Sequence, residues 1–205
     1  MDEGQGTTTK DHSGNGNDGA ITGLSWTSGK FGGGLNSDAS GENVNLGTDA
    51  TVDDIWSGGA SLSMWINVRD DGIHVTEPGM LAHKARWELM TLGDTGTACK
   101  IQFTQGFSGG DGKWHTPADS IPYNQWVHLT VVYDSSSDAN QPDFYINGVN
   151  VATTVWIGPS GDFQSDDGWD MYIGHSGVKN ADGTIDELVF YSDTLSAPEV
   201  ANLHA

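Results

Sequence analysis

Hydrophobic and polar residues alternate along several stretches of the chain, and a period of two predicts β-strands. SLSMWINV, from Ser61, places on one face Leu62, Met64, Ile66 and Val68. QWVHLTVVYD, from Gln125, groups in the same way Val127, Leu129, Val131 and Tyr133. GTIDELVFYS, from Gly183, sets Ile185, Glu187, Val189 and Tyr191 against Asp186, Leu188 and Phe190. These three segments are the principal predicted strands.

Turn residues separate these runs from shorter ones. In FYINGVNVATTV, Asn147-Gly148 stands between two alternating runs, which is typical of a β-hairpin. Weaker strand candidates are ENVNLG from Glu42, MLAHKA from Met80, WELMTLG from Trp87, KIQFTQ from Lys100 and MYIGHS from Met171. Many short strands divided by Gly, Asp and Ser clusters predict an all-β fold of two antiparallel sheets.

One short helix is predicted near the carboxyl end, in LSAPEVANL. Ser196 can cap it, with Glu199 three residues later completing a capping box, and Leu195 and Val200 can form a hydrophobic staple. We expect this segment to close one end of the sandwich. The chain shows no long linker and no internal repeat, so residues 1–205 are expected to form a single domain.

Composition fits a globular β-protein. The 205 residues include 36% hydrophobic residues, and eight Trp, six Phe and five Tyr supply large apolar side chains for a core. The single cysteine, Cys99, leaves no internal disulfide framework or cysteine-based zinc site. No apolar run is long enough to span a membrane, and no signal peptide opens this sequence.

The chain is strongly acidic. Twenty-eight Asp and Glu against eight Lys and Arg give a formal net charge of −20. This argues against a nucleic-acid partner, because phosphate backbones require basic surfaces. The acidity fits a soluble surface, and it also fits carboxylates that bind hard cations such as calcium.

A polar loop, KDHSGNGNDGAITG, brings Asp11, Asn15 and Asn17 close together in the sequence. Gly14 and Gly16 permit positive φ angles, which let a loop curl its carbonyl groups inward. One interpretation is a metal site built from carboxylate and amide oxygens. The other is that the Asn and Asp side chains hydrogen-bond the backbone of their own turn.

Four segments in order resemble the LamG-like jelly-roll domains, which are related to laminin G, pentraxins and concanavalin A-like lectins and glucanases. They are DEGQGTTTKDHSGNGNDG, SLSMWINV, IPYNQWVHLTVVYD with FYINGV, and GTIDELVFYSDTLSAPEV. The resemblance frames nearly the whole chain and implies a two-sheet jelly roll. It commonly implies a structural calcium, here held by Asp11, Asn15, Asn17 and Asp186, and Glu187 is a weaker candidate.

The sequence departs from the family at its start. Members usually open with a strand before the DEG segment, whereas Met1 stands directly before Asp2. Either the chain is truncated there, or another polypeptide completes the sheet along an open edge. Truncation is the simpler interpretation, and a strand-completing or oligomeric partner is the alternative.

Catalysis is not expected. Related glucanases carry an E-x-D-x-x-E run, which this sequence lacks, and hydrolysis needs two facing carboxylates. RWEL, from Arg86, is a faint match to an element of some polysaccharide lyases, but eight basic residues do not suggest a cleft for anionic polymers. His83, His115 and His128 share no signature with a serine or with Cys99.

Recognition is the preferred function. Jelly-roll sandwiches bind sugars with exposed aromatic faces and a few polar groups. The candidates for a ligand rim are Trp87, Trp114, Trp156 and Trp169, with packing as the alternative for each. Trp65 and Trp126 are expected within strands in structural roles.

We therefore expect a calcium-stabilised, lectin-like or adhesive module that binds a glycan or a surface protein outside the cell or on a virion. The alternative is a structural or decoration component of a larger assembly, such as a virion or a surface fibre. A glycoside hydrolase or polysaccharide lyase is the third possibility.

Overall fold

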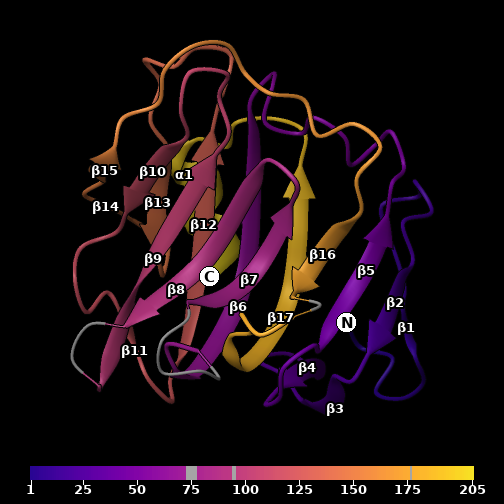
Figure 1. Cartoon of the computed structure of the whole chain (residues 1–205). Coiled ribbons are helices and arrows are strands. Elements are labelled where there is room, and N and C mark those ends of the chain that lie inside the picture. The colour runs from indigo at the N-terminus through magenta and orange to yellow at the C-terminus, as the bar shows by residue number, and fades with distance from the viewer. Residues whose placement is uncertain (73–77, 94–95, 176) are drawn as a thin grey trace.

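A computed structural model describes residues 1–72, 78–93, 96–175 and 177–205. Figure 1 shows two curved antiparallel β-sheets packed against each other, with one short helix. This arrangement confirms the predicted all-β jelly-roll sandwich. The described residues leave out Ser176, the last residue of the predicted MYIGHS segment.

Each sheet gathers strands from distant parts of the chain. The ten-stranded sheet runs in the order β1 (Thr8–Thr9), β2 (Gly19–Thr22), β5 (Asn43–Gly47), β16 (Met171–Gly174), β7 (Gly79–Lys84), β8 (Trp87–Gly93), β9 (Ala98–Gln105), β10 (Gly112–His115) and β15 (Thr154–Ile157), with β11 (Ile121–Pro122) also on β9. The seven-stranded sheet runs in the order β14 (Val149–Val151), β13 (Asp143–Ile146), β12 (Trp126–Tyr133), β6 (Ala60–Asp70), β17 (Asp182–Tyr191), β4 (Gly33–Ser37) and β3 (Ser25–Ser28).

The core lies between the two sheets and is built from the predicted alternating faces. From β6 and β12 it takes Leu62, Met64, Ile66, Val68, Val127, Leu129, Val131 and Tyr133. Trp56, Trp87 and Trp114 fill its centre and are fully buried. Burying one large apolar side chain contributes about 1.5–3 kcal/mol, so these aromatic residues stabilise the contact between the sheets.

Strand β17 does not keep the predicted period of two. The register shifts between Asp186 and Val189, and Glu187 takes a φ of 48°, so a bulge interrupts the strand. Ile185 packs into the core before the bulge, and Leu188 and Phe190 pack against it afterwards. The prediction that Val189 shares a face with Ile185 was therefore wrong, because the extra residue of a bulge reverses the alternation.

The hairpin predicted at Asn147-Gly148 is present between β13 and β14. Both turn residues have positive φ, 51° for Asn147 and 76° for Gly148. This backbone twist suits a two-residue turn between antiparallel strands.

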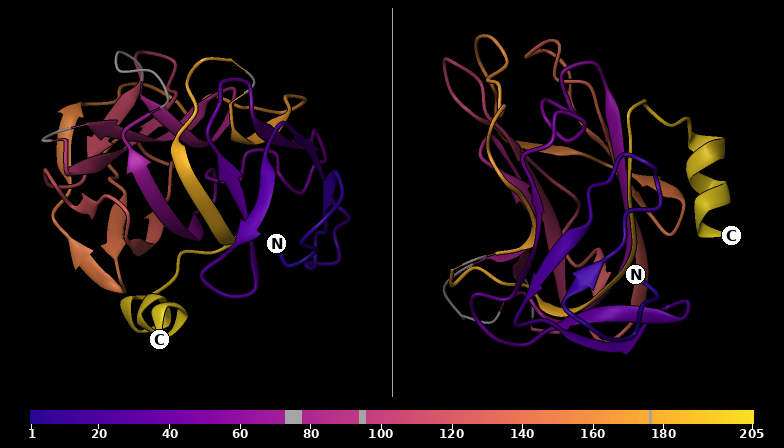
Figure 2. Two further views of the ribbon diagram at one scale, coloured as in Figure 1. Left: turned by 90° about the horizontal axis from the view of Figure 1, so that it is seen from below. Right: turned by 90° about the vertical axis from the view of Figure 1, so that its right-hand side faces the viewer.

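The predicted helix is α1 (Ala197–His204). The Glu199 carboxylate accepts hydrogen bonds from the backbone N–H and the hydroxyl group of Ser196, at 2.8 and 2.6 Å. Leu195 and Val200 pack in one cluster with Val132 and Tyr145. Figure 2 shows that the helix lies outside the seven-stranded sheet. The expectation that it closes one end of the sandwich was wrong, because its apolar side meets the outer face of β12 and β13.

In the described part of the chain, α1 is the only helix, and it is neither long nor apolar enough to cross a membrane.

Candidate functional site: the outer face of the ten-stranded sheet

Strand register assigns the two faces of the ten-stranded sheet. Residues directly opposite each other in antiparallel strands point to the same face, and the next residue along points to the other. The pairs across seven strands define one row that faces the core: Ile21, Val44, Ile173, Ala82, Leu89, Phe103 and Trp114. The adjacent row must therefore face away from the core.

This second row consists of Asn45, Tyr172, His83, Glu88, Thr104 and Lys113, and we call it the outer row. The ten-stranded sheet lies in front in Figure 1, so its outer face is turned towards the viewer. Unlike the core row, the outer row contains hydrogen-bonding, charged and aromatic side chains. Such a mixture is the chemistry expected of a binding surface.

At one end of the outer row, three side chains form a hydrogen-bonded group. The Tyr172 hydroxyl donates to Oδ2 of Asp170 at 3.0 Å, and the Asn45 amide donates to the same oxygen at 3.0 Å. Burial raises the pKa of Tyr172, and the Asp170 carboxylate raises it further. The phenol is therefore held protonated, as a fixed donor.

Aromatic rings continue the surface at the centre of the row. The His83 ring stacks on Tyr172 with centroids 5.2 Å apart, and the His175 ring lies 5.0 Å from His83. Burial lowers the pKa of His83 to about 4, and the neighbouring His175 adds to the effect. The imidazole is therefore neutral near pH 7. Its buried Nε2 has no hydrogen-bond partner among the described residues.

The other end of the face carries a second polar group beside an exposed tryptophan. His115 Nε2 lies 2.9 Å from Oε1 of Gln102, and the Gln102 amide donates to Thr104 Oγ1 at 3.1 Å. The Trp156 ring lies 5.1 Å from the His115 ring, and Lys113 Nζ lies 5.7 Å from its centroid. Trp156 is 58% exposed, so its apolar surface is open at the end of this face.

The four tryptophans predicted as a ligand rim fall into two classes. Trp156 and Trp169 are exposed, the latter by 59% and one residue before Asp170. Trp87 and Trp114 are fully buried, which corrects their assignment to a rim. Trp114 lies in β10 rather than in a loop. Its cross-strand pairing with Phe103, a core residue, places it on the core face. For these two residues the alternative, packing, is confirmed.

The residues predicted to bind calcium are held in two separate groups. In the amino-terminal loop, the Asp11 carboxylate accepts hydrogen bonds from the Ser13 hydroxyl and backbone and from the Asn17 backbone, at 2.8–2.9 Å. The Asn17 side chain donates to Thr51 Oγ1 at 2.9 Å. Asn15 is exposed in the same loop. These contacts match the interpretation of a loop that hydrogen-bonds its own backbone.

Asp186 is fully buried and lies in strand β17, next to its bulge. Its Oδ2 accepts a hydrogen bond from the Phe31 N–H at 3.0 Å, and its Oδ1 accepts one from the Glu187 N–H at 2.8 Å. Asp186 therefore has partners in β17 and in the turn before β4, whereas Asp11 has partners within its own loop. Within the described ranges, no group of three or more His, Cys, Asp or Glu side chains is arranged to hold a metal.

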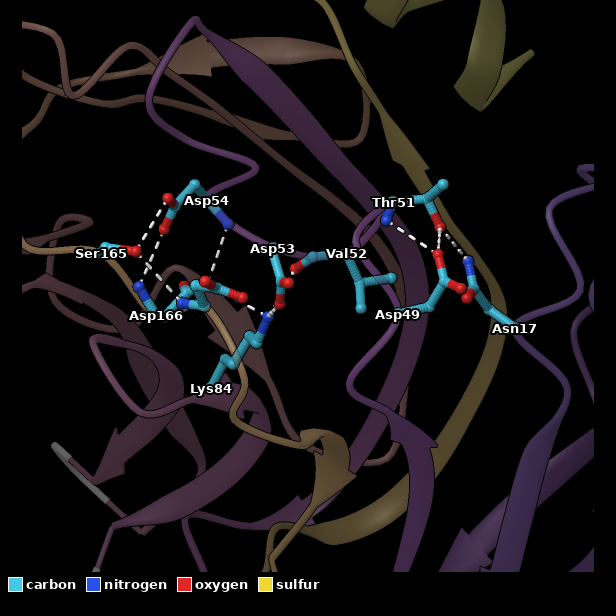
Figure 3. Close-up of polar contacts among 10 residues, drawn as sticks. Asn17, Asp49, Thr51, Val52, Asp53, Asp54, Lys84, Ser165 and Asp166 are labelled. Atoms are coloured by element: carbon cyan, nitrogen blue, oxygen red, sulfur yellow. Dashed lines mark hydrogen bonds and ion pairs between the residues drawn. The ribbon is translucent and has the colours of Figure 1, made fainter.

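A buried charged network supports the loops beside the sheet, and the sequence patterns did not predict it (Figure 3). Lys84 is fully buried; its Nζ contacts Asp53, lies 3.1 Å from Oδ1 of Asp166 and donates to the Val52 carbonyl at 3.0 Å. Asp54 and Asp166 exchange backbone-to-carboxylate hydrogen bonds of 2.9 and 2.8 Å. Burial raises the pKa of Asp166, and hydrogen bonds from Asp54 and Lys84 oppose that effect.

This network ties the segment around Asp53 to the segment that carries Trp169 and Asp170. The single signal for it in the sequence is a lysine within the apolar strand MLAHK. A lysine is rarely buried unless it is paired, so its partners are structurally important.

A Ser–His pair lies on the outer face of the other sheet. Ser63 Oγ is 2.8 Å from Nε2 of His128, but both side chains are buried, and Trp65 and His204 rings lie against His128. His128 Nδ1 has no partner in the described structure, so no third group orients the ring as nucleophilic catalysis requires.

Comparison with known proteins assigns the family. A model of the concanavalin A-like lectin/glucanases superfamily matches residues 38–201. The chain belongs to this superfamily. A comparison with curated proteins finds no match.

Solved structures with the same fold include binding domains of different origin. Domain 4 of AbnA, a GH43 extracellular arabinanase from Geobacillus stearothermophilus, in complex with arabinotriose, is 21% identical with a TM-score of 0.65, covering 94% of this chain and 90% of its own. The binding domain of Paraclostridial Mosquitocidal Protein 1 is 17% identical with a TM-score of 0.73. The match covers 95% of this chain and 48% of that domain. A native heptameric SAP-like pentraxin from Limulus polyphemus is 13% identical with a TM-score of 0.56. The match covers 73% of this chain and 70% of the pentraxin chain.

At these identities, the likeness to the solved structures shows a shared fold alone. The chain spans about half the length of two of the solved structures that it matches: the binding domain of Paraclostridial Mosquitocidal Protein 1 and the receptor binding domain of botulinum neurotoxin C/D mosaic serotype.

Proposed function

We propose that this chain is a non-catalytic recognition module that binds carbohydrate on the outer face of its ten-stranded sheet. The observation that carries the proposal is the outer row, which crosses adjacent strands in register and ends beside the exposed ring of Trp156. An exposed tryptophan offers apolar area for a pyranose or furanose ring, and fixed donors and acceptors orient its hydroxyl groups.

The fold neighbours support this choice of ligand. The arabinanase domain is solved with arabinotriose, and other neighbours are receptor-binding or binding domains. A module that meets glycans or surface proteins in this way would work outside the cell or on a virion. The proposed partner is thus a glycan at a surface, either a polysaccharide or a glycan attached to a protein.

The non-catalytic part of the proposal rests on the carboxylates of the face. The chain lacks the E-x-D-x-x-E run of related glucanases, and Oδ2 of Asp170 already accepts bonds from Tyr172 and Asn45. Glycoside hydrolysis needs one protonated and one ionised carboxyl group across the sugar bond. We expect no reducing sugar to be released from any oligosaccharide that the chain binds, and such release would refute this part.

Binding is tested by titrating arabinotriose and a panel of neutral oligosaccharides into the protein in a calorimeter. Trp156→Ala should weaken binding of a recognised sugar about tenfold, or about 1.4 kcal/mol. Phe31→Ala is the matched control, because Phe31 is an aromatic residue of similar exposure that packs against Trp65 of the other sheet. The absence of binding to every sugar, or an equal loss in both variants, would contradict the proposal.

The second candidate is a component of a larger assembly, and an open sheet edge favours it. Strand β17 pairs with β6 along most of its length, whereas β4 covers only Gly183 to Ile185 on its other side. Among the described residues, no strand pairs with Val189 to Tyr191 on that side. A strand from another polypeptide could add there. Failure to bind glycans, together with stable assembly in solution, would favour this alternative.

A further inference from the structure

One side of the molecule combines open strand edges with exposed apolar side chains. Strands β14 and β15 follow each other in the chain, yet β14 ends the seven-stranded sheet and β15 ends the ten-stranded sheet. Figure 1 shows both at the same side of the sandwich. We call this region, Val149 to Ile157, the β14–β15 edge.

The β14–β15 edge holds half of the large exposed hydrophobic side chains. Eight such residues occur in the described structure, and four lie here: Val149 (65% exposed), Val155 (43%), Trp156 (58%) and Ile157 (43%). All four residues of β15 are exposed. Concentrated apolar exposure of this kind marks an interaction site rather than ordinary surface.

The edge also lacks most of the features that prevent strand pairing. Soluble proteins protect edge strands with charged residues, prolines or bulges that twist the edge away. Thr154–Ile157 contains no charge and no proline. The register shift against β10 gives β15 one extra residue, Trp156, so a single bulge is the protective feature that this edge strand carries. Its second edge therefore presents backbone N–H and C=O groups that can pair with another strand.

Charge identifies the partner. Residues 144–161 contain no Asp, Glu, Lys, Arg or His, and this is the longest such stretch in a chain with a net charge of −20. Two copies of so acidic a protein repel each other over most of their surfaces. At the β14–β15 edge they can approach without opposing carboxylates, whereas a basic partner would be drawn to the acidic surface elsewhere.

We propose that the β14–β15 edge is the interface of a homodimer, in which β15 pairs antiparallel with β15 of a second copy. An antiparallel pair is self-complementary about a two-fold axis, so each Val155 and Ile157 covers the same residues of the partner. The two ten-stranded sheets then become one continuous sheet. The strand is short, so the interface is of the small, concentration-dependent class.

Sedimentation velocity across a protein concentration series, at low and high sodium chloride, tests the interface. We expect the apparent mass of the native protein to rise from that of a monomer towards that of a dimer as the protein concentration increases. The rise should begin at a lower protein concentration in high salt, because salt screens the repulsion between the two copies. Val155→Lys should stay a single chain throughout. Val178→Lys is the matched control, with the same substitution at a residue that is 51% exposed elsewhere, and it should behave as the native chain.

Hydrogen exchange gives a second measurement that does not depend on a variant. Amides of Thr154 to Ile157 should exchange more slowly as the protein concentration rises, while amides of the distant edge strand β3 should not change. A native chain that remains a single copy under all conditions would overturn the proposal. So would association by Val155→Lys equal to that of the native chain, or protection that rises only outside β14 and β15.

Discussion

At the residue scale, the buried Lys84 is the most consequential charge in the molecule. It lies between Asp53 and Asp166, and each of the three groups is costly to bury without the others. Because Asp166 belongs to the segment leading to Trp169 and Asp170, the pairing also fixes one end of the proposed binding face. The network therefore links the stability of the fold with the position of the site.

Lys84→Met should strongly destabilise the protein. It leaves the carboxylate of Asp166 buried without its cation, and breaking a buried pair in this way costs about 3–5 kcal/mol. Lys10→Met is the control, because Lys10 pairs with Asp18 at the exposed surface, where solvent screens the pair and the loss should be far smaller. Equilibrium unfolding in urea measures both, and similar values for the two variants would show that the network contributes no more than a surface pair.

One buried histidine, His128, and one half-buried histidine, His83, should make stability fall in acid. Burial lowers the pKa of His83 and of His128 from 6.5 to about 4, with His175 and His204 adding to the effect. Between pH 6.5 and 4, these histidines therefore bind protons in the unfolded chain but stay neutral in the folded chain. The stabilisation present above pH 6.5 is lost as the pH falls towards 4. Partial contact with solvent reduces the effect to about 2 kcal/mol for the pair.

This effect is measured by urea unfolding at pH 7, 6, 5 and 4. A variant with His83→Gln and His128→Gln should lose less stability over that range than the native chain. His12→Gln, at an exposed position, should follow the native curve. Parallel curves for the double variant and the native chain would assign the acid sensitivity to the carboxylates instead.

At the element scale, alternation predicted the long strands well, because β6 and β12 have one face in the core and carry it in every second residue. It failed where local geometry intervened. The bulge at Glu187 reversed β17, and β10 is only four residues long within a Gly-rich and Asp-rich stretch. The pattern of α1 showed which side is apolar, but not that this side would meet β12 and β13.

The residues of the candidate site were harder to predict from the sequence than the strands were. Tyr172 joins Asn45 and His83 only because β16 inserts between β5 and β7, which are far from it in the sequence. The exposed Trp156 could be proposed from its setting, whereas Trp114 looked equivalent until its strand pairing placed it in the core. Sequence alone could suggest an aromatic binding surface, but the strand order decides which residues form it.

Helix α1 should stabilise the seven-stranded sheet through one side chain. Val200 is fully buried against Val132 and Tyr145, so Val200→Ala should cost about 2 kcal/mol. Asn202→Ala, on the same helix, is the control and should change stability by less than about 0.5 kcal/mol. Urea unfolding followed by tryptophan fluorescence reports this, because His204 stacks on Trp65. No loss in Val200→Ala would mean that the helix is not docked in solution.

At the scale of the whole molecule, the net charge of −20 dominates the response to ions. Carboxylates repel one another in the folded chain, so screening by sodium chloride should raise the melting temperature without any specific site. Any test of calcium must separate a bound ion from this general effect. Magnesium chloride at the same concentration supplies the control, because it screens equally but demands a stricter octahedral geometry.

Calcium binding stays a prediction from the sequence, and the amino-terminal loop is where it should act. If the loop binds the ion, calcium at about a hundred times its dissociation constant should add roughly 2.7 kcal/mol beyond the effect of magnesium. Asp11→Asn should remove that increment, because the Asp11 carboxylate organises the loop through Ser13 and Asn17. Asp111→Asn is a control at an exposed carboxylate in the loop before β10. Equal melting temperatures in calcium and magnesium would contradict a calcium site. The loop would then be a turn held by its own hydrogen bonds, and the acidic residues would serve only as a soluble surface.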